Sequence, residues 1–220
     1  MNISFKVFLL FLFCSYSAVA QNSKSEKSAN HYFALFNYKK AIDYYESASA
    51  LSEDGKRKLA DSYRFVNDIP KALEIYKGLA STGSALSADV FLYAQTLKMA
   101  GRYDESDLWM DKFHAMSSYD SRGVEYTAFP NYADHLKKDQ DHYKITTLNI
   151  NSEQEDFSPS YYQNKVVFAS SREKFNAVTD RRWNGTQLPF IDIYVCDTMS
   201  SGQLSNAEDF PIFSNEKYHD

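Results

Sequence analysis

The sequence contains little of what most catalytic or metal-binding sites require. Its 220 residues include two cysteines, two tryptophans and only seven glycines. The sequence contains no glycine-rich phosphate loop, no Gly-x-Ser-x-Gly nucleophile motif, and no pair of its five histidines with HxxxH or HExxH spacing. We therefore predict a protein that is not an enzyme and that uses no cofactor and no metal.

Positive charge is not in excess either, because the sequence has 24 lysines and arginines and 29 aspartates and glutamates. The formal net charge is −5. Proteins that bind nucleic acid through its phosphates need a basic surface. We therefore expect no nucleic-acid partner. At 44% hydrophobic and 24% charged residues, the composition is typical of a globular chain.

The N-terminal segment has the pattern of a secretory signal peptide. Lys6 precedes the apolar run Val7–Phe13, and the small residues Ala18–Ala20 precede Gln21. The run is too short to cross a hydrocarbon core of about 30 Å. We predict a signal peptide at residues 1–20 and an exported mature chain without a transmembrane span. The alternative is an uncleaved anchor.

Cleavage there would leave Cys196 as the one cysteine of the mature chain, which excludes an intramolecular disulfide. Cys14 follows the bulky Phe13, which argues against lipid attachment at this cysteine. Cys196 lies in an apolar stretch, and we interpret it as a small buried hydrophobic residue. A reactive thiol is the alternative.

Small residues recur in pairs, twelve positions apart, and each pair is accompanied by larger residues three or four positions further on. Steps of three and four define one face of a helix. The pattern predicts three helical hairpins in which a small residue of one helix lets the partner helix approach closely. The predicted packing residues are Ala29, Tyr32, Ala41, Tyr45, Ala60, Tyr63, Ala72, Tyr76, Ala94, Leu97, Ser106 and Met110.

Turn residues fall where these hairpins must reverse, at Asn37, at residues 67–70 and at Gly101. A further helix is predicted over Ser121–Lys138, interrupted at Pro130. We assign Tyr45 and Tyr76 to packing. The alternative is a generic helical bundle with alanine-rich contacts.

Over residues 25–116 the chain resembles the tetratricopeptide repeat family, in the small residue before a tyrosine on the first helix and in Ala-x3-aromatic on the second. The tryptophan usual in that family is missing, and the third copy has Ser106 and Met110. The resemblance implies a solenoid at residues 21–140 that binds a partner protein. Asp43 and Tyr44 lie off the packing face and are the predicted groove residues.

After residue 141 the sequence loses its helical periodicity. Three short segments are rich in β-branched and aromatic residues, and clusters of Asn, Ser, Gly and Pro separate them. These segments are Tyr143–Ile150, Lys165–Ser170 and Ile191–Cys196. The pattern predicts three short strands that pair as an antiparallel meander. Asn149–Glu155 faintly resembles a calcium loop but lacks the turn glycine, so we interpret it as a solvated loop. Asn184–Thr186 fits a glycosylation sequon but is interpreted as a turn.

The segment Asp156–Arg172 resembles the blade motif of TolB-like, WD-type β-propellers. The residues that carry this likeness are Asp156, Phe157, Pro159, Phe168, Ser170 and Arg172. The resemblance implies that residues 141–220 form a first blade and the start of a second. One blade cannot close a propeller, so we expect the chain to be truncated relative to a longer protein. The alternative is that the β segment docks on its own helices or on another chain.

The order of signal peptide, helical hairpins and blade resembles Bacteroidetes-type OmpA-family envelope proteins. The resemblance implies an α+β fold in separate domains, and a periplasmic, outer-membrane-associated scaffold that binds another envelope protein or a peptide. Peptidoglycan would be bound only through a C-terminal domain that the sequence lacks. The alternatives are the N-terminal part of a propeller-gated hydrolase and a truncated product without independent function.

Overall fold

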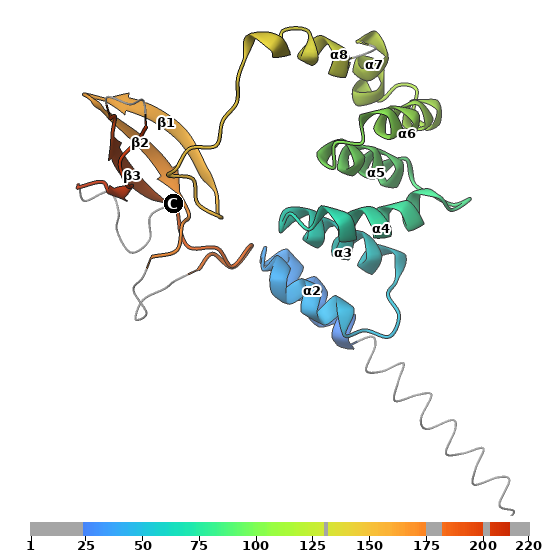
Figure 1. The fold of residues 1–220 in the computed structure, drawn as a ribbon. Coiled ribbons are helices and arrows are strands. Elements are labelled where there is room, and N and C mark those ends of the chain that lie inside the picture. The colour runs from blue at the N-terminus through green and yellow to red at the C-terminus, as the bar shows by residue number, and fades with distance from the viewer. Residues whose placement is uncertain (1–23, 130–131, 175–181, 200–202, 212–220) are drawn as a thin grey trace, which may run out of the picture. The chain divides into compact units, whose positions relative to one another are not determined.

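The computed structural model describes residues 24–129, 132–174, 182–199 and 203–211. It has the α+β composition predicted from the sequence, with helices first and a small antiparallel sheet after them (Figure 1). The chain separates into two compact units, with the division between Lys138 and Asp139. Among the described residues, no helix has both the length and the apolar character needed to cross a bilayer.

The helical unit is a row of helices in which each packs mainly against its neighbours in sequence (Figure 1). A leading helix occupies residues 24–34. It is followed by α2 (Tyr38–Glu46), α3 (Glu53–Phe65), α4 (Ile69–Ala80), α5 (Ser87–Met99), α6 (Tyr103–Met116), α7 (Ser121–Ala128) and α8 (Tyr132–Lys137). The helix predicted over residues 121–138 is thus divided into α7 and α8, and Pro130 lies outside the described residues.

Three hairpins share one turn geometry. In each, one residue adopts a left-handed conformation, with φ of 56° at Phe36, 62° at Asn67 and 74° at Gly101. The backbone amide of the next residue donates a hydrogen bond to the carbonyl oxygen five residues earlier in the chain. These bonds run from Asn37 to Tyr32 (2.9 Å), from Asp68 to Tyr63 (2.8 Å) and from Arg102 to Leu97 (2.9 Å). The predicted turn positions are therefore confirmed.

The predicted packing residues lie where the helices of each hairpin meet. All are buried except Tyr32, which is partly buried against the same core. The third hairpin shows why serine replaces alanine there, since Ser106 Oγ donates a 2.8 Å hydrogen bond to the carbonyl of Ala94. Serine is small enough for the close approach and satisfies its own hydroxyl on the facing backbone.

A second contact recurs fifteen residues apart in every hairpin. Tyr45 donates to Asn30 at 2.8 Å, and Tyr76 donates to Asp61 at 2.6 Å. In the third hairpin the equivalent pair is Gln95 and Met110, whose nitrogen and sulfur are 3.8 Å apart. The hairpins therefore repeat in side-chain contacts as well as in backbone.

The C-terminal unit contains a four-stranded antiparallel sheet in the order β1-β2-β3-β4, formed by β1 (Asp156–Tyr162), β2 (Lys165–Ser170), β3 (Asp192–Asp197) and β4 (Glu208–Asp209). A one-turn 3-10 helix (Gln140–His142) precedes it. The predicted meander and the strands near 165–170 and 191–196 are confirmed. The turn at Asn184–Thr186 is also confirmed, and Cys196 is buried at 2% exposure.

The strand predicted at Tyr143–Ile150 is wrong, because these residues form no strand and the sheet instead begins at Asp156. Ile145 is 96% exposed, whereas Ile150 packs against the sheet core. The segment is held by side chains, with Asn149 Nδ2 donating to the carbonyl of Leu204 at 2.9 Å. β-Propensity depends strongly on context, so residue types that are common in strands do not by themselves form one, and this segment pairs with no strand.

Arg172 holds this unit together. Its guanidinium donates to the carbonyl of Ile150 at 3.0 Å and to Asp156 Oδ1 at 2.9 Å. It also lies over the rings of Phe168 and Tyr194, at 5.0 and 4.7 Å from their centroids. One side chain thus ties the preceding segment, the first strand and the aromatic core together.

Acidification is expected to destabilise the C-terminal unit through Asp156. Burial alone would raise the pKa of this carboxyl group, but hydrogen bonds from Ser170, Ser152 and Arg172 hold it at about 2, below its ordinary 3.8. Its stabilising effect is therefore complete above about pH 5 and lost as the pH falls toward 2, a change of about 2 kcal/mol.

The measurement is urea unfolding at a series of pH values, followed by Trp183 fluorescence in a Trp109→Phe background. Asp156→Asn should be less stable at neutral pH and should lose most of the acid dependence. An unchanged pH profile in Asp156→Asn would assign the acid sensitivity to another group.

Candidate partner-binding surface

The helices of the N-terminal unit lie in two layers. The first helices of successive hairpins contact one another, as Lys58 Nζ of α3 donates to Asn30 of the leading helix at 3.1 Å. Contacts also join the second helices, since Lys112 Nζ of α6 donates to the carbonyl of Ala80 in α4 at 3.2 Å. Lys71 and Glu46 make a 3.7 Å ion pair between α4 and α2. Both layers therefore continue from hairpin to hairpin.

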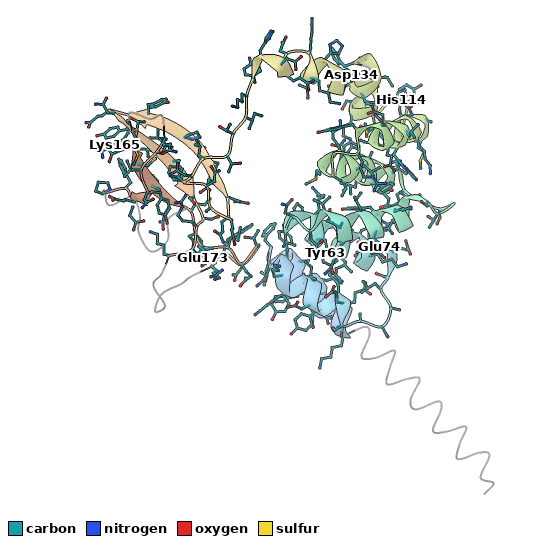
Figure 2. All side chains as sticks on the ribbon, viewed as in Figure 1. Tyr63, Glu74, His114, Asp134, Lys165 and Glu173 are labelled. Carbon is teal, nitrogen blue, oxygen red and sulfur yellow. The ribbon has the colours of Figure 1, made fainter. Side chains whose placement is uncertain are left out.

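Further contacts secure each junction between hairpins. Tyr63 of α3, labelled in Figure 2, donates a hydrogen bond to Glu46 of α2. Burial, followed by this bond, raises the pKa of Tyr63. At the far end, the Arg122 guanidinium of α7 lies 4.2 Å from the ring centroid of Phe91 in α5. Side-chain contacts of more than one kind therefore join neighbouring hairpins and the helix that follows them.

The junction between α3 and α5 is an ion pair with a buried carboxylate. Arg57 Nε and Nη2 donate to Asp89 Oδ1 and Oδ2 at 2.7 and 2.9 Å, and only 1% of the Asp89 side chain is exposed. Asp89 also accepts from the amide of Leu86, at the start of α5, at 3.3 Å. The hydrogen bond with Asp89 raises the pKa of Arg57. This pair therefore links the first helices of the second and third hairpins.

A continuous set of half-buried side chains follows from this arrangement, and we call it the first-helix strip. Its members recur at steps of three and four on the first helices, so they share one face of each helix. Because the first helices are neighbours, these faces join across the hairpins. The strip consists of Asn30, Phe33, Asp61, Arg64, Phe91, Gln95 and Lys98.

Arg64 is the residue of the strip best placed to bind a partner. Its Nη2 donates to Asp61 at 3.0 Å, and the guanidinium lies 4.6 Å from the ring centroid of Phe65. The hydroxyl of Tyr76, on the partner helix α4, donates to the same Asp61 oxygen. Arg64 Nε makes no hydrogen bond to any described residue. That atom is buried, but 24% of the Arg64 side chain is exposed, and a guanidinium held in place by Asp61 suits a backbone carbonyl or a carboxylate of a partner.

Asp43 and Tyr44, the predicted groove residues, lie on α2, in the layer of second helices. Both are exposed. Tyr44 stacks on Tyr32 with ring centroids 5.2 Å apart and an interplanar angle of 11°. They are therefore separate from the first-helix strip. The strip had a signal in the sequence, because Asn30, Asp61 and Gln95 directly follow the alanines that mark the repeat.

The residues of the predicted blade motif take two kinds of position. Phe168 and Ser170 are buried and Asp156 is partly buried, and all three lie beside Arg172. Phe157 and Pro159 are exposed, and together with Asp156 and Phe168 they border a pocket of about 120 Å³. A larger cleft of about 330 Å³ is lined by Glu155, Ser171, Trp183, Thr186, Leu188, Pro189, Phe190 and Ile191.

Among the described ranges, no group of three or more His, Cys, Asp or Glu side chains could hold a metal ion. No family model matches the chain, and no curated protein matches it.

Proposed function

We propose that this chain is a non-catalytic scaffold of the bacterial cell envelope that binds another envelope protein, or a peptide segment of one, on the first-helix strip. The observation that carries the proposal is the alignment of equivalent, half-exposed side chains from three successive hairpins. Tyr45 and Tyr76 of the second helices already hold Asn30 and Asp61 by hydrogen bonds, so these side chains lose less conformational entropy when a partner binds. Guanidinium, amide and aromatic groups in one strip suit an extended peptide.

We propose in addition that the helical unit is a tetratricopeptide-type solenoid and that the sheet is a propeller-type blade. The shared turn and the contacts repeated at twelve and fifteen residues support the first assignment. The meander order and the cluster around Arg172 support the second. The signal-like segment at residues 1–20 supports export to the periplasm, which cell fractionation tests directly.

Site-specific photocrosslinking in cells tests the binding surface. A photoreactive phenylalanine analogue placed at Phe33 and at Lys98, at equivalent positions of the first and third hairpins, should capture the same envelope protein. Placed at Glu74 and Lys77, which are exposed on α4 (Glu74 is labelled in Figure 2), it should capture nothing in common with them. Equal capture at the strip and on α4 would contradict the proposal.

Arg64→Ala provides the quantitative test with the partner so identified. Truncation of a central arginine in an interface typically costs more than about 1 kcal/mol, which is a loss of affinity of roughly fivefold or more. Lys77→Ala is the matched control and should leave affinity unchanged. Thermal unfolding of both variants must be compared, because Arg64 also bonds to Asp61.

A further inference from the structure

The turn of the first hairpin differs from the other two in its side chains. Leu35 and Phe36 project from it and are 56% and 64% exposed. The equivalent pairs are Val66–Asn67 in the second turn and Ala100–Gly101 in the third. Only the first turn therefore presents two adjacent bulky apolar side chains to solvent. We call Leu35–Phe36 the apolar tip.

Phe36 is also strained. Its φ of 56° lies in the left-handed region, which Asn and Gly adopt readily and which costs an ordinary residue energy. The other hairpins place Asn67 and Gly101 at this position, so the fold itself does not require phenylalanine. Strain at an exposed aromatic residue indicates a role outside folding.

The segment that carries the tip is basic. No Asp or Glu occurs between Glu26 and Asp43, whereas Lys27, Lys39 and Lys40 lie within that stretch and are exposed. In the second turn the left-handed residue is followed by Asp68, and in the third by Arg102 and then, two positions later, by Asp104. The segment that carries the apolar tip therefore has a local charge complementary to an anionic surface.

Behind the tip, aromatic rings form a rigid base. Tyr38 stacks on Phe65 with centroids 4.6 Å apart and contacts the edges of Phe33 and Phe36 at 5.7 and 6.3 Å. Packed rings therefore support the tip, while Leu35 and Phe36 stay more than half exposed. Exposed apolar side chains followed closely in the chain by exposed lysines suit insertion between anionic lipid headgroups.

We propose that the Leu35–Phe36 tip inserts into the surface of a membrane containing anionic phospholipid, with Lys39 and Lys40 contacting the headgroup phosphates. The helical array is then oriented by its first hairpin while the first-helix strip stays free. This role is independent of protein binding at the strip.

Vesicle co-sedimentation of the chain from Gln21, the predicted mature form, tests the proposal. Vesicles of phosphatidylcholine with one quarter phosphatidylglycerol should bind the protein, and vesicles of phosphatidylcholine alone should bind it at least fivefold more weakly. Lys39→Glu/Lys40→Glu should weaken binding roughly tenfold or more, since each lysine near an anionic surface contributes about 1 kcal/mol. High salt should act in the same direction.

Phe36→Asn separates this role from a structural one. Asparagine accepts the left-handed backbone, so the melting temperature should be unchanged or raised while vesicle binding falls at least fivefold. Leu108→Asn, at a residue of α6 that is 69% exposed, is the matched control and should bind as the unmodified protein does. Full vesicle binding by Phe36→Asn, or no vesicle binding by the unmodified protein, would overturn the proposal. Loss of the photocrosslinked partner in Phe36→Asn, without an effect on vesicles, would overturn it in favour of a protein contact.

Discussion

Arg57→Met should lower the free energy of unfolding of the helical unit by about 3 kcal/mol, because it leaves the buried carboxylate of Asp89 without its counter-charge. The Asp89 side chain is 1% exposed, so water cannot replace the guanidinium. Within the part of the chain that the structure describes, the side chain of Asp89 would keep only the 3.3 Å hydrogen bond from the Leu86 amide. The measurement is urea unfolding followed by far-UV circular dichroism.

The matched control is the double variant Arg57→Met/Asp89→Asn, which removes the buried charge and keeps an acceptor for the Leu86 amide. It should recover about 2 kcal/mol relative to Arg57→Met, because the desolvated charge accounts for most of the cost. Stability of the single variant within 1 kcal/mol of the unmodified protein would mean that the junction between α3 and α5 depends on apolar packing, with the ion pair adding little.

Tyr76→Ala should cost about 3 to 5 kcal/mol, since it removes a fully buried ring from the centre of the second hairpin. The ring is 0% exposed, and its hydroxyl donates to Asp61 at 2.6 Å. Burial, and then the negative charge of Asp61, raises the pKa of Tyr76, so the phenol stays protonated and remains a donor at neutral pH. Equilibrium unfolding in urea again gives the value.

Tyr76→Phe separates the ring from the hydroxyl. It keeps the packing and removes one hydrogen bond to Asp61, so the expected cost is about 1 kcal/mol. Equal costs for Tyr76→Ala and Tyr76→Phe would show that the hydrogen bond, and not the ring, carries the effect. The same pair of substitutions at Tyr45 should follow the same order, because Tyr45 bonds Asn30 in the equivalent place.

Sequence periodicity predicted the helical unit well because the interactions involved are local. Ala94 and Ser106 are twelve residues apart and face each other across one turn, so their contact follows from two helix faces and a short loop. The same holds for the turns at Asn67 and Gly101, whose residue types tolerate a left-handed backbone. Phe36 breaks that rule, and only the backbone angles identify it as strained.

The first strand of the sheet was harder to predict, since strand formation requires a partner that the local sequence does not specify. Tyr143–Ile150 has the residue types of a strand and forms none, whereas Asp156–Tyr162, with Pro159 in it, pairs with β2. A register shift between Phe157 and Ser160 accommodates the proline in an edge strand. Propensity alone therefore ranked the two segments in the wrong order.

Sequence by itself determined the small and large packing residues that repeat in the hairpins and where the turns fall, because short-range periodicity and turn chemistry express these features directly. The tertiary structure alone decided that Arg57 meets Asp89 across 32 positions, that Arg64 and Tyr76 donate to the same oxygen of Asp61, and that Asp43 and Tyr44 lie on a second helix whereas the strip lies on the first helices. Those features depend on how helices pack within and between hairpins, and the rotation between neighbouring hairpins is set by many weak contacts that no single sequence pattern encodes.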